Sequence, residues 1–370
     1  MIGIEDRHWI EGAAREAGFD LAGVAAVPES ATPEAEVSDR RFSEFIEQGR
    51  AGEMEYLKRA DEDGALVRGG LRRAIPWARS VLVCAVNYNA EAPRSIESAD
   101  EGAGWIARYA WSGRDGRGSD YHDVLLPMLM RVEETFKERF AECMTRCYVD
   151  TGPIVEREYA ARAGVGWIGK NTCVLNQQQG SWLLLGVIVT SLELKLEARP
   201  VIAADRCGSC TRCIDACPTD ALIAPRQMDA SRCIAYLTIE KKGSIAEELR
   251  PLMGRQVFGC DICQDVCPWN RRAPVAVSNA LPSRPELVNP ALEWLAQMDR
   301  PTFNRWFRGS PLERTRRKRV LRNVAMAMGN SGESRFLPQL EAWAGEDDAV
   351  LAEAARWAME RLKTLSHAAG

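Results

Sequence analysis

The sequence predicts an α+β protein made of three parts. Residues 1–200 carry helix-type and strand-type hydrophobic patterns in alternation, which indicates a mixed α/β domain. Residues 201–272 hold most of the 12 cysteines, which indicates a small domain organised by metal ligands. A proline-rich linker over residues 273–290 leads to a helical part over residues 291–370. At 370 residues the chain is long enough for two or three hydrophobic cores.

The first elements follow from hydrophobic spacing. An amphipathic helix is predicted over residues 5–18, where Gly18 closes it. Strands are predicted at 20–27 and 80–88, and the second is an apolar run typical of a buried strand. A long helix is expected over 121–140 because apolar residues recur at helical spacing there.

The remaining elements of the first domain surround Asp150. A short strand is predicted to end there, and a helix is predicted to begin with Pro153 and to end at Gly164. Val174 and residues 182–190 are predicted to form a hairpin across the glutamine-rich turn between them.

The C-terminal part is predicted to be entirely helical. Residues 322–330 have the small and apolar pattern of HEAT-type repeats. Residues 291–370 leave room for only about two such repeats, so a short HEAT-like helical domain is expected rather than a solenoid.

Bulk properties place the chain among soluble proteins. The formal net charge is −4, so the chain as a whole is not basic. The start, Met1 to His8, has no basic region followed by an apolar stretch, and no window approaches the ~18 apolar residues that span a bilayer. We therefore expect a cytoplasmic protein that does not bind membranes.

The cysteine spacing is typical of iron–sulfur ligands. A first run has the pattern C-x2-C-x2-C-x3-C-P, in which the fourth cysteine serves the second cluster of a pair; it consists of Cys207, Cys210, Cys213 and Cys217. A second run is one ligand short; it consists of Cys260, Cys263 and Cys267. Cys233 supplies the missing thiolate, so eight cysteines match two [4Fe-4S] clusters.

The spacing predicts a crossed pairing, because short steps wrap one cluster while the three-residue step directs the fourth cysteine away. The first cluster is assigned Cys207, Cys210, Cys213 and Cys267. The second cluster is assigned Cys217, Cys233, Cys260 and Cys263. Zinc and disulfides are the alternatives, but zinc knobs seldom use this spacing, and no export signal favours disulfides.

The stretch from Arg206 to Arg272 resembles the ferredoxin domain of epoxyqueuosine reductase. The matching words are CGSCTRCIDACPT at 207–219, SRCIAYLT at 231–238 and GCDICQDVCPWN at 259–270. Upstream, the words DYHD at 120–123, VDTG at 149–152 and GKN at 169–171 also resemble that family. The likeness covers essentially the whole chain.

This resemblance implies a reaction and its cofactors. The domain over residues 1–200 would hold cobalamin, fed with electrons by the two clusters. The substrate would be tRNA carrying epoxyqueuosine at the wobble position of the anticodon, and the product queuosine, in the last step of queuosine biosynthesis. A flavodoxin- or ferredoxin-type protein would donate the electrons, and the chain would act as a monomer.

Asp150 is the candidate proton donor. On the residues alone, an aspartate just ahead of a helix is more often a capping residue. The resemblance instead implies that this carboxyl protonates the departing epoxide oxygen beside the cofactor, so Asp150 is also a candidate cofactor contact.

Further cofactor contacts are implied by the same resemblance. Arg68 matches a family position near the cofactor, and the loop that follows Gly169 would touch the corrin. That loop contributes Lys170, Asn171, Thr172 and Cys173. Asp261, between two ligands of the second cluster, would face the corrin or serve only in a turn.

A basic segment from Arg300 to Arg322 is the candidate tRNA contact. Basic residues with interleaved aromatics, here Phe303, Trp306 and Phe307, suit phosphate contacts and base stacking. The alternative is a solvated helical face with the aromatics in the core. The residues expected to contact tRNA are Arg316, Arg317, Lys318 and Arg319.

The stretch from Trp111 to Ser119 departs from the family pattern. It is Gly- and Arg-rich and longer than the resemblance leads us to expect, so it is interpreted as a mobile loop near the substrate entrance.

Three other functions remain open from the sequence. One is a cobalamin and iron–sulfur reductase that acts on a small molecule such as an organohalide. Another is an electron-transfer protein with no substrate of its own, and the third is a zinc-bound tRNA-binding module.

Overall fold

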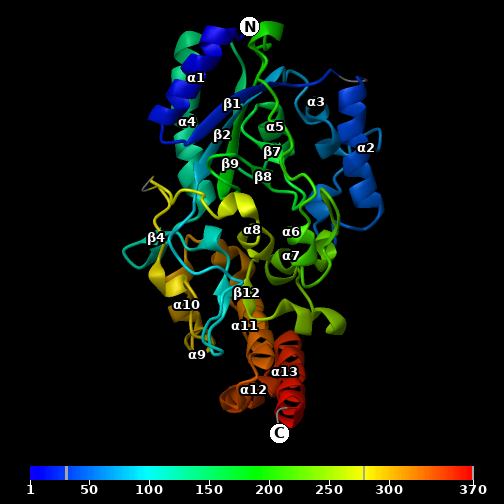
Figure 1. The fold of residues 1–370 in the computed structure, drawn as a ribbon, viewed down its shortest axis with the longest axis vertical. Coiled ribbons are helices and arrows are strands. Elements are labelled where there is room, and N and C mark those ends of the chain that lie inside the picture. Colours follow the sequence, from blue (N-terminus) through cyan, green and yellow to red (C-terminus); the bar gives the residue numbers. More distant parts are fainter. Residues whose placement is uncertain (30–31, 278–279, 369–370) are drawn as a thin grey trace.

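A four-stranded sheet organises the N-terminal part of the molecule (Figure 1). Its order is β1-β2-β9-β6 and each neighbouring pair is antiparallel, the strands being β1 (Leu21–Ala26), β2 (Ser80–Asn87), β6 (Thr145–Tyr148) and β9 (Leu183–Thr190). The structure is a computed structural model that describes residues 1–370 apart from 30–31, 278–279 and 369–370.

Helices cover both faces of this sheet because β2 is apolar on both sides. Every residue of β2 is buried, and alternate side chains of a strand point to opposite faces. Helices α1 (Ile4–Glu16) and α4 (Tyr121–Arg139) pack on one face, as the hydrophobic spacing predicts. Helices α3 (Leu71–Ala74) and α5 (Glu156–Arg162) pack on the other, with α2 (Pro33–Glu47) outside them (Figure 1).

Two predicted elements differ from those observed. The helix expected from Pro153 begins at Glu156, after an irregular turn. Strand β8 (Val174–Leu175) pairs with β7 (Trp167–Ile168) rather than with β9, so the predicted hairpin is wrong beyond its turn. The turn itself is present, because the backbones of Asn176 and Gly180 bond each other at 2.8 and 3.0 Å.

The cysteine-rich part consists of short elements joined by loops. They are α6 (Arg212–Asp215), β10 (Leu222–Ala224), β11 (Gln227–Met228), α7 (Ile234–Ile239), β12 (Gln256–Phe258) and α8 (Ile262–Asp265). Strand β12 runs parallel to β3 (Trp105–Ile106), which ties this part to the N-terminal part.

The C-terminal part is helical, as predicted, and lies at the lower end of Figure 1. Its helices are α9 (Leu292–Ala296), α10 (Arg300–Phe307), α11 (Pro311–Ser331), α12 (Leu337–Ala344) and α13 (Ala349–Ala368). One continuous apolar core joins it to the cysteine-rich part, since Phe258 of β12 and Val324 of α11 belong to the same cluster. Within the described residues, no helix is long and apolar enough to cross a membrane.

The stretch from Trp111 to Ser119 contains a short hairpin. Strands β4 (Gly113–Arg114) and β5 (Arg117–Gly118) pair across Asp115 and Gly116, whose φ angles are 50° and 71°. Positive φ at both central residues matches the twist of a two-residue hairpin turn. The hairpin projects from the side of the molecule near α10 (Figure 1).

Candidate active site and cluster-binding region

The cysteines of the first predicted set lie close enough to influence one another. Burial raises the pKa of Cys213, and the thiols of Cys207 and Cys210 add to that rise. Burial raises the pKa of Cys267 to about 11, with further contributions from Cys207 and Cys213. The structure therefore brings Cys267 to the first cysteine loop, although more than 50 residues separate them along the chain.

The second predicted set is brought together in the same way. Burial raises the pKa of Cys260, and the thiols of Cys233 and Cys217 add to this. A hydrogen bond with Cys173, then burial, raises the pKa of Cys263, and Cys260 and Cys233 also contribute. In the described part of the chain, no three His, Cys, Asp or Glu side chains converge closely enough to hold a single metal ion.

Backbone N–H groups point at several of these sulfurs. Cys233 accepts hydrogen bonds from the backbone of Ala235 and Tyr236, Cys260 from Ile262, and each bond lowers the pKa of its cysteine. Iron–sulfur clusters need thiolate ligands, and hydrogen bonds to sulfur tune them. The donor set thus suits thiolate-bound clusters.

The loop after Gly169 contacts both cysteine regions. Lys170 Nζ donates to the carbonyl of Gly208, beside the first cysteine loop, at 2.7 Å. Asn171 is buried and its amide donates to the carbonyl of Cys263 at 3.4 Å. The hydrogen bond with Cys263 lowers the pKa of Cys173 to about 7. Thr172 adopts a φ of 67° in this tight turn.

Asp261 is buried between two cysteines of the second set. Its Oδ2 accepts a hydrogen bond from the backbone N–H of Arg108 at 2.7 Å. Burial, then the charge of Asp265, raises the pKa of Asp261 to about 7. One carboxylate oxygen of Asp261 therefore anchors the Arg108 segment, which is a structural role.

Asp150 is exposed just beyond β6 and has a φ of 55°. It does not cap α5, because Val155 holds the N-cap position of that helix without a side-chain bond. Instead, the hydroxyl of Tyr121 donates a hydrogen bond to Asp150 Oδ2 at 2.8 Å. The carboxylate is therefore held by Tyr121 and not by the helix that follows it.

Tyr121 is itself fixed from two directions. Its ring stacks on that of His122 at 4.1 Å between centroids. The guanidinium of Arg314, on α11, lies 5.6 Å from the Tyr121 ring centroid and bonds Asp120 at 2.6 Å. A residue of the C-terminal part thus supports the residue that holds Asp150.

Further aromatic and acidic groups surround Asp150. Tyr56 is 54% exposed; its partial burial, then the charges of Glu240 and Asp150, raise its pKa. Burial also raises the pKa of Tyr109 and Tyr121, again with a contribution from Asp150. The pKa of Glu156 rises from 4.5 to about 7, chiefly through burial. Among the described residues, Glu156 Oε1 is buried without a hydrogen-bond partner.

No local sequence pattern marks these residues as neighbours of Asp150. Tyr121 lies within the DYHD word, which marks it as a candidate site residue. The word does not show that its hydroxyl bonds Asp150. Tyr56, Tyr109 and Glu156 belong to separate segments that only folding brings together.

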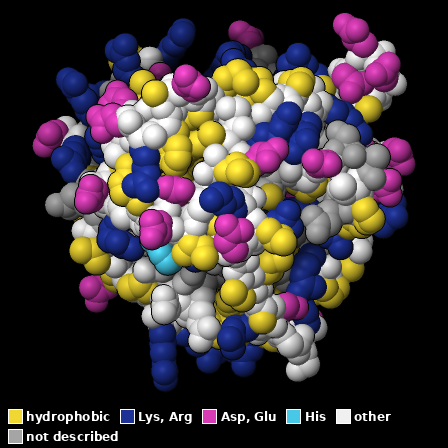
Figure 2. All heavy atoms as spheres, turned by 90° about the horizontal axis from the view of Figure 1, so that it is seen from above, with side chains coloured by type: hydrophobic (Ala, Val, Ile, Leu, Met, Phe, Trp, Pro, Cys, Tyr) yellow, Lys and Arg dark blue, Asp and Glu magenta, His cyan; other side chains and the backbone are white. Residues whose placement is uncertain are grey.

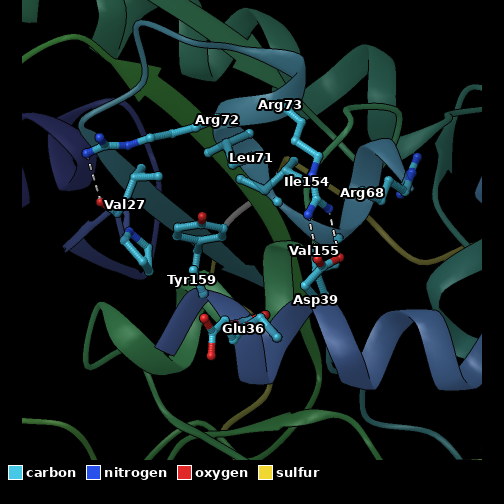
Figure 3. A pocket seen from close by; sticks show the side chains of 16 residues that line it. Val27, Glu36, Asp39, Arg68, Leu71, Arg72, Arg73, Ile154, Val155 and Tyr159 are labelled. Carbon is cyan, nitrogen blue, oxygen red and sulfur yellow. Dashed lines mark hydrogen bonds and ion pairs between the residues drawn. The ribbon is translucent and has the colours of Figure 1, made fainter. Parts of the chain in front are cut away.

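Arg68 borders a cavity of about 280 Å³ between α2, α5 and the chain around α3 (Figure 3). Arg73 pairs with Asp39 inside it, and Arg72 donates to the carbonyl of Val27 at 3.2 Å. Figure 3 shows Arg68 lying apart from the Arg73–Asp39 pair. The Arg68 guanidinium is 5.7 Å from the ring centroid of Tyr56, one of the neighbours of Asp150.

The basic segment of α11 divides into inward and outward side chains. Arg317 donates to the carbonyl of Met298 at 2.7 Å, and Arg319 to that of Ile239 at 2.9 Å. Arg316 and Lys318 are exposed, and Arg316 has a φ of 64° at a kink in the helix. Arg317 and Arg319 therefore use guanidinium N–H groups in hydrogen bonds within the protein.

The interleaved aromatics belong to the core. Phe303 and Phe307 are buried, and Trp306 packs edge-on against Trp294 at 5.1 Å. Phe303 and Phe307 thus fit the alternative interpretation, in which the aromatics lie in the core, because the amphipathic spacing of α10 turns them inward; Trp306 is half-buried. The end of the molecule opposite the C-terminal helices, seen in Figure 2, carries acidic and basic side chains that are interspersed on its surface.

Two family models match this chain. One, described as a 4Fe-4S double cluster binding domain, matches residues 206–270. The other, described as epoxyqueuosine reductase QueG, matches residues 68–151.

Curated relatives match nearly the full length of the chain. An epoxyqueuosine reductase of Xanthomonas campestris is 35% identical over 349 residues, which cover 94% of this chain and 93% of that protein. One of Escherichia coli is 34% identical over 346 residues, which cover 93% and 86%.

Solved structures agree in fold. A crystal structure of epoxyqueuosine reductase with an epoxyqueuosine-modified tRNA-Tyr stem loop has a TM-score of 0.82 at 27% identity and covers 97% of this chain and 90% of that one. A Bacillus subtilis epoxyqueuosine reductase, with an aspartate-bearing catalytic loop swung out of its active site, has a TM-score of 0.81 at 28% identity, with the same coverage.

Proposed function

The chain belongs to the epoxyqueuosine reductase family, and from this premise we propose how its own residues serve the reaction. It reduces epoxyqueuosine in tRNA and uses cobalamin and two [4Fe-4S] clusters. Turning an epoxide into an alkene takes two electrons and two protons and releases one water. The product proposed is queuosine at the wobble position of the anticodon.

Residues 201–272 are proposed as the two-cluster domain, with the crossed pairing of its ligands. Mutual influence among the thiols supports the pairing, because Cys267 responds to Cys207 and Cys213, whereas Cys260 responds to Cys233 and Cys217. The second cluster would then lie against the part of the loop that carries Asn171 and Cys173.

Asp150 is proposed as the acid that protonates the departing oxygen. The supporting observation is the 2.8 Å hydrogen bond from Tyr121 to Asp150 Oδ2. This bond occupies one carboxylate oxygen and leaves the other to carry the transferred proton. Burial raises the pKa of Tyr121, so its hydroxyl stays protonated and remains a donor at neutral pH. The aspartate-bearing catalytic loop of the Bacillus subtilis relative is consistent with this role.

Residues 1–200 are proposed as the cobalamin-binding domain. A corrin carries amide groups that donate hydrogen bonds. Glu156 Oε1, which has no hydrogen-bond partner within the described part of the chain, is a buried acceptor beside Asp150 that suits them. Arg68 and the loop through Lys170, Asn171, Thr172 and Cys173 would hold the cofactor. Asp261 would face the cofactor from the segment between Cys260 and Cys263. When bound, cobalamin supplies a cobalt centre that delivers the electrons to the epoxide.

The C-terminal part, residues 291–370 beyond the linker at 273–290, is proposed to contact the tRNA. Among the four residues expected there, Arg316 and Lys318 are exposed and suit phosphate contacts. Arg317 and Arg319 would act through the backbone that they brace. The chain is further proposed to work as a cytoplasmic monomer with a flavodoxin- or ferredoxin-type electron donor.

Anaerobic reconstitution tests this assignment. The chain is loaded with iron, sulfide and cobalamin, reduced chemically and given tRNA that carries epoxyqueuosine. Nucleoside analysis should show queuosine only when cobalamin and both clusters are present. Equal product without cobalamin would contradict the proposal.

A further inference from the structure

A surface hollow lies over the segments that carry the cluster ligands. It has a volume of about 400 Å³, and its walls come from α6, from α8 with the residues that follow it, and from the segment around Ile96. The residues that matter below are Arg94, Ile96, Arg212, Val266 and Arg271. None of them has a role in the site around Asp150.

The hollow is adjacent to both groups of cysteines. Arg212 directly precedes Cys213, and Val266 directly precedes Cys267; both cysteines are in the first set. Cys217, in the second set, directly follows another wall residue, Ala216. Electron transfer falls steeply with distance, so a redox partner seated here would face the clusters through one layer of protein.

One wall of the hollow is held in place by a buried carboxylate. The backbone N–H and the hydroxyl of Ser95 donate to Asp265 Oδ2 at 2.8 and 2.6 Å. Asp265 lies on α8 and is only 2% exposed. This anchor fixes the neighbouring Ile96, whose side chain remains 45% exposed on the rim. An apolar residue is thus presented to solvent on a fixed segment.

The cluster loops have an arginine-rich border. The exposed arginines are Arg206, Arg212, Arg271 and Arg272. Among the acidic neighbours, Asp205 pairs with Arg226. Asp215 is exposed on the wall of the hollow and accepts a hydrogen bond from Thr211 at 2.7 Å, so the four exposed arginines outnumber it there. Arg94 is itself paired with Glu97 at 2.7 Å. The surface therefore combines an exposed apolar residue with a positive rim.

We propose that this hollow is the docking site for an acidic, low-potential redox protein of the flavodoxin or ferredoxin type. Redox encounter complexes are small, and charge complementarity speeds their formation. The inference rests on the proposed function, which requires an electron source. Each docking event oxidises the donor by one electron and reduces one cluster by one electron. Two events supply the two electrons that, with two protons, convert the epoxide to an alkene and water.

Stopped-flow reduction of the reconstituted holoenzyme tests the docking site. The probe is a flavodoxin in its hydroquinone form, and bleaching of the cluster absorbance is followed without oxygen. At low ionic strength, Arg212→Glu with Arg271→Glu should slow reduction about tenfold or more, because the steering charge is reversed. Added salt should slow the parent but not this variant. The control variant is Arg15→Glu with Arg40→Glu, which makes the same charge change at exposed sites on α1 and α2. Its clusters should be reduced at the parent rate.

Additional arms separate the possible failures. Photoreduced deazariboflavin, a small neutral reductant, should reduce the parent and every variant equally. If the parent reduced in this way forms no queuosine, the proposed function is contradicted, whereas the docking site is not. Arg271→Glu alone and Ile96→Ser are milder variants should the double variant hold less iron. Flavodoxin reduction at the parent rate in these variants would overturn the docking site. So would weakened tRNA binding with unchanged flavodoxin reduction, which would make the hollow an RNA contact.

Discussion

Tyr121→Phe is the sharpest test of how Asp150 is held. The substitution removes one hydroxyl, and with it the 2.8 Å hydrogen bond to Asp150 Oδ2, while the ring keeps its stacking on His122. A hydrogen bond to a charged group contributes about 1.5–3 kcal/mol. If that energy positions the carboxyl in the transition state, the rate constant should fall about 10- to 100-fold, since 1.4 kcal/mol is one factor of ten.

The assay is a single turnover with reconstituted, chemically reduced enzyme and saturating modified tRNA, followed by nucleoside analysis. Cobalamin absorbance and tRNA affinity should match those of the parent. Tyr109→Phe is the matched control, because it removes a hydroxyl from the same wall and leaves the Tyr121–Asp150 bond in place. A Tyr121→Phe rate within about twofold of the parent would refute the positioning role.

Three other predictions concern the clusters, the buried acid and the basic segment. Cys233→Ser should lower the iron content from about eight to about four atoms per chain, as measured after anaerobic reconstitution; full iron would contradict the ligand assignment. The raised pKa of Glu156, from 4.5 to about 7, means that the folded state binds its proton more tightly than the unfolded state does. This contribution to stability is complete below about pH 4.5 and is lost as pH rises through about 7, by at most about 3 kcal/mol. Glu156→Gln should therefore raise Tm relative to the parent more at pH 8 than at pH 5.5, and a pH-independent difference would refute the burial argument. Arg316→Gln with Lys318→Gln should reduce the log–log salt slope of tRNA binding by roughly 1.4–1.8. Arg319→Gln should chiefly lower Tm, because it loses the hydrogen bond to the carbonyl of Ile239. The reverse pattern would contradict the division of α11 into inward and outward side chains.

The crossed ligand grouping is an inference from local geometry and stays a prediction. Steps of two residues turn successive cysteines toward one centre, so the spacing alone indicates a crossed arrangement of Cys217 and Cys267. Long periodic elements such as α4 were predictable, since the apolar stripe needs only one helix to be recognised.

The surroundings of Asp150 could not be predicted in this way. Tyr121 is 29 residues from Asp150 and on another element, and no local pattern links a helix start to a distant loop. The same limit applies to Arg317 and Arg319, because a run of arginines does not show which side chains will find backbone carbonyls. The pairing of β8 with β7 was missed because two-residue strands carry almost no periodic signal.

The proton-donor role of Asp150 is tested most directly by Asp150→Asn in fully reconstituted enzyme. The variant should keep both clusters, bound cobalamin and parental affinity for epoxyqueuosine tRNA, yet form no queuosine in a single turnover. Asparagine preserves the size of the side chain but cannot give up the proton that the departing oxygen needs. Queuosine formed at the parental rate would contradict the account.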